Sequence, residues 1–275
     1  MHDKLDSLRC CLADLQSVLV AFSGGVDSSF LLWVAADTLG SRCTALTTVS
    51  MAVPENDEAQ ARRLTANLGI RHLVISTNEL ASADYARNTT NRCYFCKDHL
   101  FRICEREARR LQIRAVVDGA NADDLGDHRP GLLAAQKAGV RHPLIEVGLR
   151  KEEVRALSRR LGLETWDQPS SPCLSSRIPY GMAITPERLA QVSAGERFLR
   201  ECGFRELRLR HHDHTARLEI PVADLPRLLD QELRTAIVNR LRQLGFTYVT
   251  VDLAGFRSGS LNDLALTSLG RQQHA

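Results

Sequence analysis

Short apolar runs alternate with segments of helical periodicity along the first two thirds of the chain. Leucines spaced three and four residues apart predict an amphipathic helix over 3–15. The strands that follow are expected at 17–22, 43–49, 72–76 and 114–118, and the helices at 28–39, 54–68, 95–111 and 150–161. This alternation predicts an α/β fold in which helices cover both faces of a parallel sheet. Such sheets bind ligands at the carboxyl ends of their strands.

The pattern changes in an irregular stretch over 166–186 that is rich in proline. Beyond it we expect a smaller α+β unit. Its elements are a helix over 186–202, strands over 205–210 and 215–220, helical segments near 223–244 and a last strand over 246–252. The sequence therefore predicts two domains, over 1–180 and 181–275.

The strand that ends at Phe22 runs directly into Ser23-Gly24-Gly25-Val26-Asp27-Ser28-Ser29. A strand, a glycine turn and a helix start direct backbone N–H groups and the positive end of the helix at one point, which suits a diphosphate. We expect Ser28 or Ser29 to cap the helix. Asp27 is expected to hold Mg²⁺ or to accept backbone N–H bonds. The run lacks the Gly-Lys-Ser/Thr of a Walker A loop.

A second candidate loop follows the strand over 114–118 and should lie beside the first. Within it, Asn121, Asp123 and Asp124 are candidates to position the nucleotide or Mg²⁺. The alternative is a solvated turn of the kind that Asn and Asp often form. The place of the loop at the carboxyl edge of the sheet favours the functional interpretation.

The chain contains eight cysteines and no recognisable secretory signal, so metal binding or sulfur chemistry is favoured over disulfides where cysteines cluster. Cys93 and Cys96 form a Cys-x-x-Cys pair, and Cys173 lies in the irregular stretch. These three thiols suit a [4Fe–4S] cluster with one iron left open. The alternatives are a buried pair at a helix start and a chance loop thiol. The remaining cysteines are expected to pack within helices and strands: Cys10, Cys11, Cys43, Cys104 and Cys202.

Composition narrows the class of protein. The chain has 275 residues, 44% hydrophobic and 25% charged, with a net charge of +3. These values are those of an ordinary globular protein and give no general attraction to nucleic acid. No apolar run has the length of a membrane span. We expect a cytoplasmic protein without a membrane or nucleic-acid partner.

With these residues in view, the chain resembles the PP-loop (N-type) ATP pyrophosphatases and, within them, the LarE family of ATP-dependent sulfur transferases. The resemblance covers nearly the whole chain, and its most specific motif is Cys173-Leu174-Ser175-Ser176-Arg177. It implies an adenine nucleotide alpha hydrolase-like, doubly wound parallel sheet followed by a smaller α+β domain for substrate binding and oligomerisation. The glycine loop is then assigned to ATP.

The family adenylylates a carboxylate of pyridinium-3,5-dicarboxylate mononucleotide and exchanges oxygen for sulfur, a step in nickel-pincer nucleotide biosynthesis. Its members take sulfur either from one sacrificed cysteine or from a three-cysteine iron–sulfur cluster with a spare sulfide. The resemblance thus implies ATP, Mg²⁺ and, for this chain, a cluster held by Cys93, Cys96 and Cys173. Lys97 and Arg177 are expected near the thiols, as cations that favour thiolates.

The family pattern further implies that Glu196 and Glu219 line a substrate and metal region, and that Arg208 or Arg210 pairs with the substrate phosphate. A solvated Glu196 and a simple polar strand face are the alternatives. Expected partners are the small-molecule nucleotide substrate, a sulfur donor system, a downstream nickel-inserting protein and further copies of the chain.

Three other classes of protein share some of these features. A tRNA thiolase pairs a similar loop with cysteines, but it should present a broad basic surface with aromatic residues. An amidating ligase of the NAD- or GMP-synthetase type would leave the three cysteines without a role. A nucleotide-sensing or metal-storage protein would keep the loop and lack turnover.

Overall fold

The computed structural model describes residues 2–126, 130–169 and 172–257. The chain divides into two compact units. The first unit comprises Met1–Glu79 and Asn91–Ser171, and the second comprises Leu80–Thr90 and Pro172–Ala275. The main part of the second unit thus begins at Pro172, earlier than the boundary expected near residue 180. The second unit also includes a short segment, Leu80–Thr90, that lies in sequence between the two parts of the first unit.

The first unit contains a four-stranded sheet in the order β3-β2-β1-β4, in which all strand pairs are parallel. The expected parallel α/β sheet is therefore confirmed. The strands are β1 (Val18–Ala21), β2 (Cys43–Val49), β3 (Arg71–Ser76) and β4 (Ala115–Asp118). The helices of this unit are α1 (His2–Leu15), α2 (Val26–Leu39), α3 (Glu55–Asn67), α5 (Arg92–Arg110), α6 (Pro130–Lys137), α7 (Pro143–Glu146) and α8 (Lys151–Arg160).

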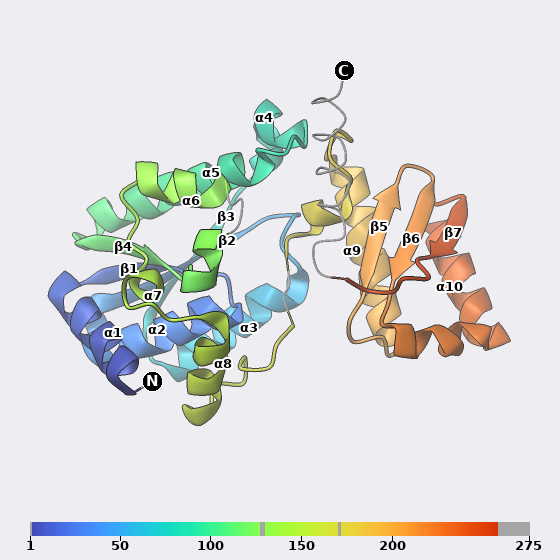
Figure 1. Ribbon diagram of the computed structural model, residues 1–275. Coiled ribbons are helices and arrows are strands. Elements are labelled where there is room, and N and C mark those ends of the chain that lie inside the picture. Colours follow the sequence, from blue (N-terminus) through green and yellow to red (C-terminus); the bar gives the residue numbers. More distant parts are fainter. Residues whose placement is uncertain (1, 127–129, 170–171, 258–275) are drawn as a thin grey trace, which may run out of the picture. The chain divides into compact units, whose positions relative to one another are not determined.

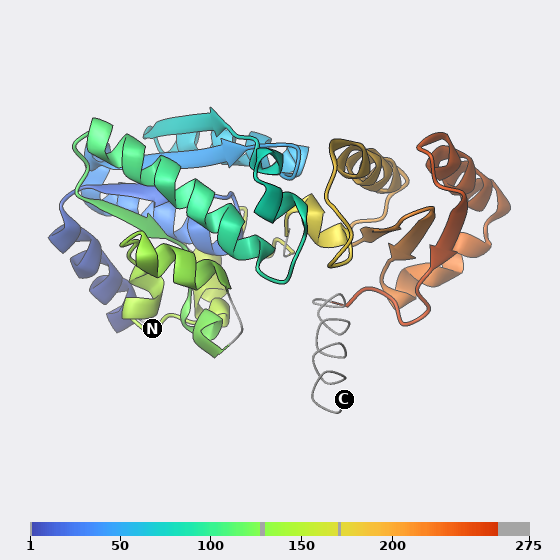
Figure 2. The same ribbon diagram turned by 90° about the horizontal axis from the view of Figure 1, so that it is seen from above.

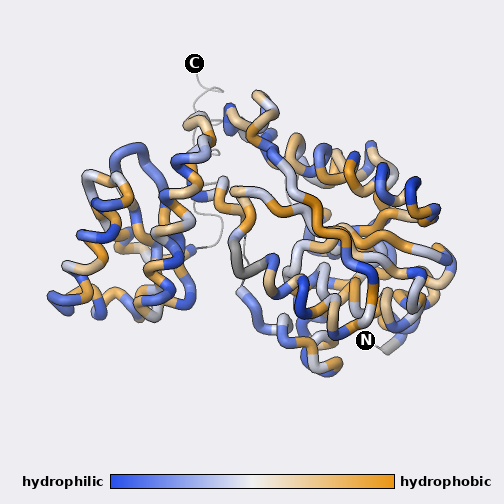
Figure 3. The backbone as a smooth tube through the Cα atoms, turned by 180° about the vertical axis from the view of Figure 1, so that it is seen from behind, coloured by the Kyte–Doolittle hydropathy of each residue, from blue (hydrophilic) through white to orange (hydrophobic). Residues whose placement is uncertain are grey.

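The helices cover both faces of this sheet because its side chains alternate between two apolar clusters (Figures 1 and 2). Val18, Val20 and Phe22 face the side of α1, α2 and α8, whereas Leu19 and Ala21 face α5 and α6. The central strands form the main hydrophobic run of the unit in Figure 3. Burial on both faces accounts for the continuous apolar runs that predicted the strands.

The second unit is the α+β structure expected from the sequence. Its three-stranded sheet has the order β5-β6-β7, with an antiparallel β5–β6 pair and a parallel β6–β7 pair. The strands are β5 (Arg208–His212), β6 (Thr215–Glu219) and β7 (Tyr248–Val251), and the helices are α4 (Ala83–Ala86), α9 (Pro186–Glu201) and α10 (Gln231–Gln243). Leu209, Leu218 and Leu241 belong to its separate core.

The short segment over 80–90 is attached firmly within the second unit. The side-chain amide of Asn88 donates to the carbonyls of Ile178, Pro179 and Met182, at 3.2, 2.8 and 2.9 Å. The hydroxyl of Tyr85 lies 2.6 Å from that of Ser175. These contacts hold the irregular stretch that carries Cys173. None of the helices among the described residues is long and apolar enough to cross a lipid bilayer.

Candidate active site

The glycine loop follows β1 and leads into α2, at the carboxyl edge of the sheet. Gly24 adopts a φ of 79°, a left-handed conformation that glycine takes without a steric penalty. The hydroxyls of Ser23 and Ser28 lie 3.0 Å apart, and the Gly25 N–H points to Ser23 Oγ at 3.4 Å. This tight turn at a helix N-terminus has the geometry that binds anions.

The helix begins two residues earlier than the sequence predicted, and this corrects the expected cap. Gly25 is the N-cap of α2 and provides no side-chain cap, so Ser28 and Ser29 lie within the first turn. Their hydroxyls donate back to the loop, from Ser28 to the Gly25 carbonyl at 3.1 Å and from Ser29 to the Gly24 carbonyl at 3.3 Å. Both serines therefore stabilise the turn rather than cap the helix.

Gly119 brings the second loop against the first. A Cβ added to Gly119 would lie 2.7 Å from Ser28 N and 2.9 Å from Ser28 Cα, too close for any side chain. The close approach follows from the parallel pairing of β4 with β1, which places Asp118 opposite Ala21. The two candidate loops are therefore side by side, as expected.

Asp27 is paired with Lys151, a residue that the sequence analysis did not identify. Lys151 Nζ donates to Asp27 Oδ2, while Oδ1 is buried and has no hydrogen-bond partner among the described residues. Asp27 binds a lysine here rather than the backbone N–H groups suggested from the sequence. An unpartnered carboxylate oxygen at a phosphate loop is a suitable ligand for Mg²⁺. Beside it, Asp123, Arg150, Lys151, Glu152 and Arg155 line a hollow of about 380 Å³.

The polar side chains of the second loop bind backbone N–H groups. Asp124 Oδ2 accepts from Asn121 N at 2.9 Å, and Asn121 Oδ1 accepts from Asp123 N at 3.0 Å. Asp123 Oδ2 accepts from Lys151 N at 2.8 Å and so fixes the first turn of α8. In this arrangement the loop positions Lys151 beside Asp27.

Asp118 and His142 form a second pair at this edge that the sequence analysis missed. Asp118 Oδ1 lies 2.6 Å from His142 Nδ1, and it also accepts from the backbone N–H of Ala120 at 3.1 Å. Burial raises the pKa of Asp118, but the hydrogen bond from His142 and the charge of Lys97 outweigh it and hold the pKa below its usual value. The β-bridge between Val117 and Arg141 brings the two residues together, and their spacing in the sequence does not reveal it.

Cys93 and Cys96 lie in the first turns of α5, which begins at Arg92 rather than at Phe95 as expected. Residues three apart lie on the same side of a helix. Cys93 is exposed and Cys96 is partly buried. Cys173 belongs to the second unit, where it is the N-cap residue of the short 3₁₀ helix over Leu174–Arg177 and is also partly buried. Within the described part of the chain, no cysteine forms a disulfide and no three His, Cys, Asp or Glu side chains gather at one point.

Of the other cysteines expected to pack, two are fully buried, whereas Cys10 is exposed and the expectation is wrong for it. Cys43 and Cys104 are buried, and burial raises the pKa of each thiol to about 12. Burial and a hydrogen bond to Glu146 raise the pKa of Cys11 to about 11. Such thiols remain protonated at neutral pH and are poor nucleophiles.

In the second unit, Arg177 and Glu196 are buried together. Glu196 is fully buried, so the alternative of a solvated residue is wrong. Its carboxylate accepts from Arg177, from Arg200 at 2.9 Å and from the backbone N–H of Leu209 at 3.2 Å. The Arg177 Nη1 group donates to the carbonyls of Pro172 and Cys173, at 2.7 and 3.2 Å. Glu196 thereby orients Arg177, which in turn holds the backbone around Cys173.

Glu219 has a similar position on β6. It accepts from Arg210 Nη2 and Arg217 Nη2, each at 2.8 Å, and it is fully buried. Arg210 also donates to the carbonyl of Ser176 at 2.7 Å, which ties β5 to the Cys173 stretch. Arg208 lies on the same side of β5 as Arg210. Burial and the neighbouring Arg177 lower the pKa of Arg208 to about 10.

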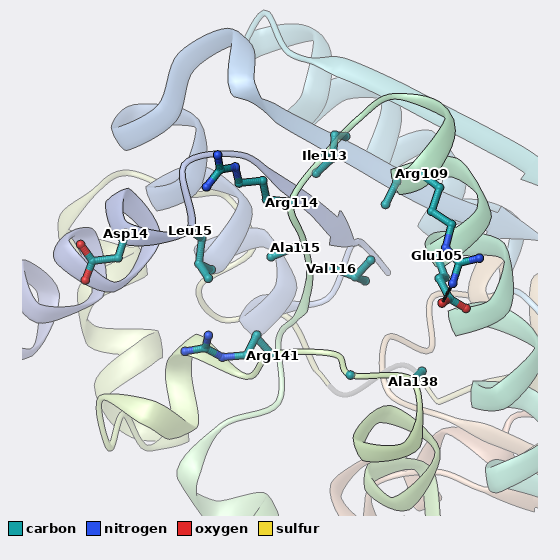
Figure 4. A pocket seen from close by; sticks show the side chains of 12 residues that line it. Asp14, Leu15, Glu105, Arg109, Ile113, Arg114, Ala115, Val116, Ala138 and Arg141 are labelled. Carbon is teal, nitrogen blue, oxygen red and sulfur yellow. Dashed lines mark hydrogen bonds and ion pairs between the residues drawn. The ribbon is translucent and has the colours of Figure 1, made fainter.

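A larger hollow of about 470 Å³ lies at the opposite edge of the first sheet, around the amino end of β4 (Figure 4). Arg109, Arg114 and Arg141 lie around it, together with Asp14 and Glu105. None of the predicted site residues lines it. Ligands of parallel sheets bind at the carboxyl edge, so the glycine loop is the candidate active site.

Known proteins are similar to this chain in sequence and in fold. Residues 5–161 match the family model described as asparagine synthase. The solved structure of NMN synthetase from Francisella tularensis is similar in fold, with a TM-score of 0.52 and 22% identity over 62% of this chain and 75% of that one. At this identity the likeness concerns the fold alone.

Two relatives align along almost their whole length. An uncharacterized protein of Synechocystis is 41% identical over 95% of this chain and 98% of its own. The pyridinium-3,5-bisthiocarboxylic acid mononucleotide synthase of Lactiplantibacillus plantarum is 40% identical over 94% of each chain. The chain therefore belongs to the LarE family of ATP-dependent sulfurtransferases, built on a PP-loop ATP pyrophosphatase fold.

Proposed function

We propose that this protein uses ATP to convert a carboxylate of pyridinium-3,5-dicarboxylate mononucleotide to a thiocarboxylate, in the synthesis of the nickel-pincer nucleotide. The observation that carries this proposal is the 40% identity, along 94% of the chain, to a synthase named for the bisthiocarboxylic acid product. The glycine loop and the Asp27 carboxylate at the sheet edge supply the ATP-binding features that the reaction requires.

In the first half of the reaction, a substrate carboxylate oxygen attacks the α-phosphorus of ATP and diphosphate leaves. The backbone N–H groups of the loop and the N-terminus of α2 stabilise the charge on the departing diphosphate. Asp27 would hold Mg²⁺, which neutralises phosphate charge when bound. Lys151, already paired with Asp27, supplies a second cation at the same place.

In the second half, sulfur attacks the activated carbonyl carbon and AMP departs from it. Cys93, Cys96 and Cys173 would hold a [4Fe–4S] cluster that supplies the sulfur as an extra sulfide. The donor set fits such a group, because thiolates are its usual ligands and three ligands leave one iron open. The exposed Cys93, the neighbouring Cys96 and the partly buried Cys173 are not committed to disulfides.

Anaerobic purification tests the cluster. We expect brown protein that contains iron and acid-labile sulfide, and loss of most of the iron in C93A, C96A and C173A variants. The control is C10A, which changes an exposed cysteine at the start of the chain. Colourless, iron-free protein that loses the mass of H₂S during turnover would instead assign the sulfur to Cys173 itself.

Substrate assays test the reaction. AMP and diphosphate should form from ATP only when the dicarboxylate mononucleotide is present, and mass spectrometry should detect one exchange of oxygen for sulfur per AMP. Ammonia-dependent AMP release would support an amidating ligase, and a specific, salt-sensitive tRNA complex would support a tRNA thiolase. ATP binding without diphosphate release would support a nucleotide sensor.

The second unit would bind the substrate phosphate through Arg208. The lowered pKa of this arginine, about 10, reflects burial and the repulsion of Arg177 and Arg210, so an anion placed there relieves unfavourable charge. R208A should raise the KM for the mononucleotide at least about tenfold, since a charge-assisted hydrogen bond is lost. The control R205A changes an exposed arginine of the same unit. Oligomerisation through this unit and transfer to a nickel-inserting protein remain predictions, which sedimentation and pull-down experiments test.

A further inference from the structure

The Asp118–His142 pair lies at the edge where the nucleotide should bind, and the mechanism above does not use it. Asp118 is the last residue of β4 and stands opposite Ala21 of β1, shortly before the glycine loop. The next residue, Gly119, touches the backbone of Ser28. His142 follows Arg141, whose carbonyl accepts from Asp118 N at 3.2 Å. The pair is therefore one strand away from the position assigned to the diphosphate.

The imidazole is held in one orientation by its Nδ1 atom. Asp118 Oδ1 lies 2.6 Å from Nδ1, and the two side chains are only 10% and 19% exposed, for Asp118 and His142 respectively. Among the residues that the structure describes, none is within hydrogen-bond distance of Nε2. A carboxylate at Nδ1 fixes the ring and makes Nε2 more basic, which favours the imidazolium form in which Nε2–H is a donor.

Charged groups on three elements surround this ring. The hydrogen bond that His142 donates to Asp118 on β4 raises the pKa of His142 above its ordinary 6.5, whereas burial opposes this. Glu146 on α7 raises the pKa further and Lys97 on α5 lowers it. The protonated imidazole, Lys97 and Arg141, which pairs with Glu146, give three positive charges against the two carboxylates of Asp118 and Glu146. This excess suits an anion.

We propose that His142, oriented by Asp118, donates its Nε2–H to the α-phosphate of the bound nucleotide. This inference rests on the proposed assignment of the glycine loop to the diphosphate of ATP. With the diphosphate in the loop after β1, the adjoining α-phosphate lies toward a neighbouring strand, and the end of β4 is where Asp118 holds His142. The α-phosphate remains in AMP after diphosphate leaves, so His142 would bind ATP and AMP but not free diphosphate.

Calorimetric titration of the full-length protein with AMP and with inorganic diphosphate separates these cases. H142Q should weaken AMP binding about ten- to hundredfold, the value of one charge-assisted hydrogen bond, and should leave diphosphate binding unchanged. The control H99Q changes an exposed histidine on α5 of the same unit. Equal AMP binding by H142Q and H99Q would overturn the proposal, as would equal losses for AMP and diphosphate.

The pH dependence provides a test that needs no substitution of His142. Because the pKa of His142 is raised, the imidazolium is present below that value and disappears as the pH rises through it. Wild-type affinity for AMP should therefore fall as the pH rises above 6.5. In D118N this fall should occur at lower pH. AMP affinity that does not change between about pH 6.5 and 9 contradicts the proposal.

The two proposals fail separately. If H142Q loses AMP binding but the protein makes no thiocarboxylate, the assignment of His142 stands and the proposed substrate is wrong. If thiocarboxylate forms and H142Q binds AMP normally, the proposed substrate stands and the assignment of His142 is wrong.

Discussion

Arg177 and Glu196 form a two-point ion pair in which Nε–Oε1 is 2.7 Å, Nη2–Oε2 is 3.1 Å and neither side chain is more than 1% exposed. Removal of one partner from such a pair leaves an uncompensated buried charge. Because Arg177 also holds the carbonyls of Pro172 and Cys173, the pair joins the stability of the second unit to the position of its candidate sulfur ligand.

The E196A variant should destabilise the second unit by about 3–5 kcal/mol. Circular dichroism during urea unfolding measures this loss. Tryptophan fluorescence should change little, because both tryptophans, Trp33 and Trp166, belong to the first unit. E201Q, at the exposed end of the same helix, is the matched control. An unchanged transition in E196A would show that the pair contributes no stability.

The D27N variant should lower the rate of diphosphate release by about a hundredfold or more, because one anionic ligand near the departing diphosphate is lost. The Mg²⁺ concentration that gives half of the maximal rate should be higher in D27N than in wild type. Steady-state assays over a Mg²⁺ series measure both quantities. D37N lies on the exposed end of the same helix and should behave as wild type. A D27N enzyme with normal Mg²⁺ dependence would remove Asp27 from the metal site.

The G119A variant should move the glycine loop, because its Cβ would lie 2.7 Å from Ser28 N. Overpacking of this kind costs about 1–3 kcal/mol, and tryptophan-detected unfolding of the first unit measures it. We expect ATP affinity to fall in parallel. The control G126A has open space around its Cβ. Normal ATP affinity in G119A would mean that the loops separate without effect on the site.

His72 should contribute to the stability of the first unit in a way that depends on pH and is lost in acid. Burial, together with the charge of Arg62, lowers its pKa below 6.5, and its ring lies 3.0 Å from Thr65 Oγ1 and 2.9 Å from Thr47 Oγ1. The unfolded chain therefore binds the proton more tightly, and this contribution is present above about pH 6.5 and decreases as the pH falls toward the folded pKa.

Unfolding experiments at pH 7.5 and 5.5 measure this slope. The H72Q variant should lose less stability than wild type between those two pH values, whereas H99Q should follow wild type. Parallel slopes in H72Q and wild type would show that His72 does not account for the acid sensitivity. The comparison uses slopes because H72Q also changes the two threonine contacts.

The features that the sequence predicted well are local in the chain. The Ser23–Ser29 loop could be recognised because a strand, two glycines and a helix start follow one another directly. The parallel sheet followed from apolar runs that alternate with helical periodicity, and the family resemblance is confirmed by the relatives. The start of α2 was wrong because Val26 and Asp27 form a helical turn without any side-chain cap to mark it.

The features that the sequence did not predict depend on contacts between distant residues. Lys151 meets Asp27, and His142 meets Asp118, only after β1 and β4 have paired. From the sequence alone, Glu196 resembles a surface residue on α9, because its buried partner Arg177 comes from the distant irregular stretch. These three pairs cannot be predicted from residue spacing or composition, because each forms only in the folded chain.

The second unit takes Leu80–Thr90 from one part of the chain and Pro172 onward from another. During translation, Asn88 therefore leaves the ribosome before the carbonyls of Ile178, Pro179 and Met182 that it binds have been made. At ~5–20 residues per second, the wait is on the order of ten seconds. The Asn88 segment thus has no partners while the rest of the first unit, over 91–171, is being made. A gene fragment that ends before Pro172 would keep this segment without the carbonyls that it binds.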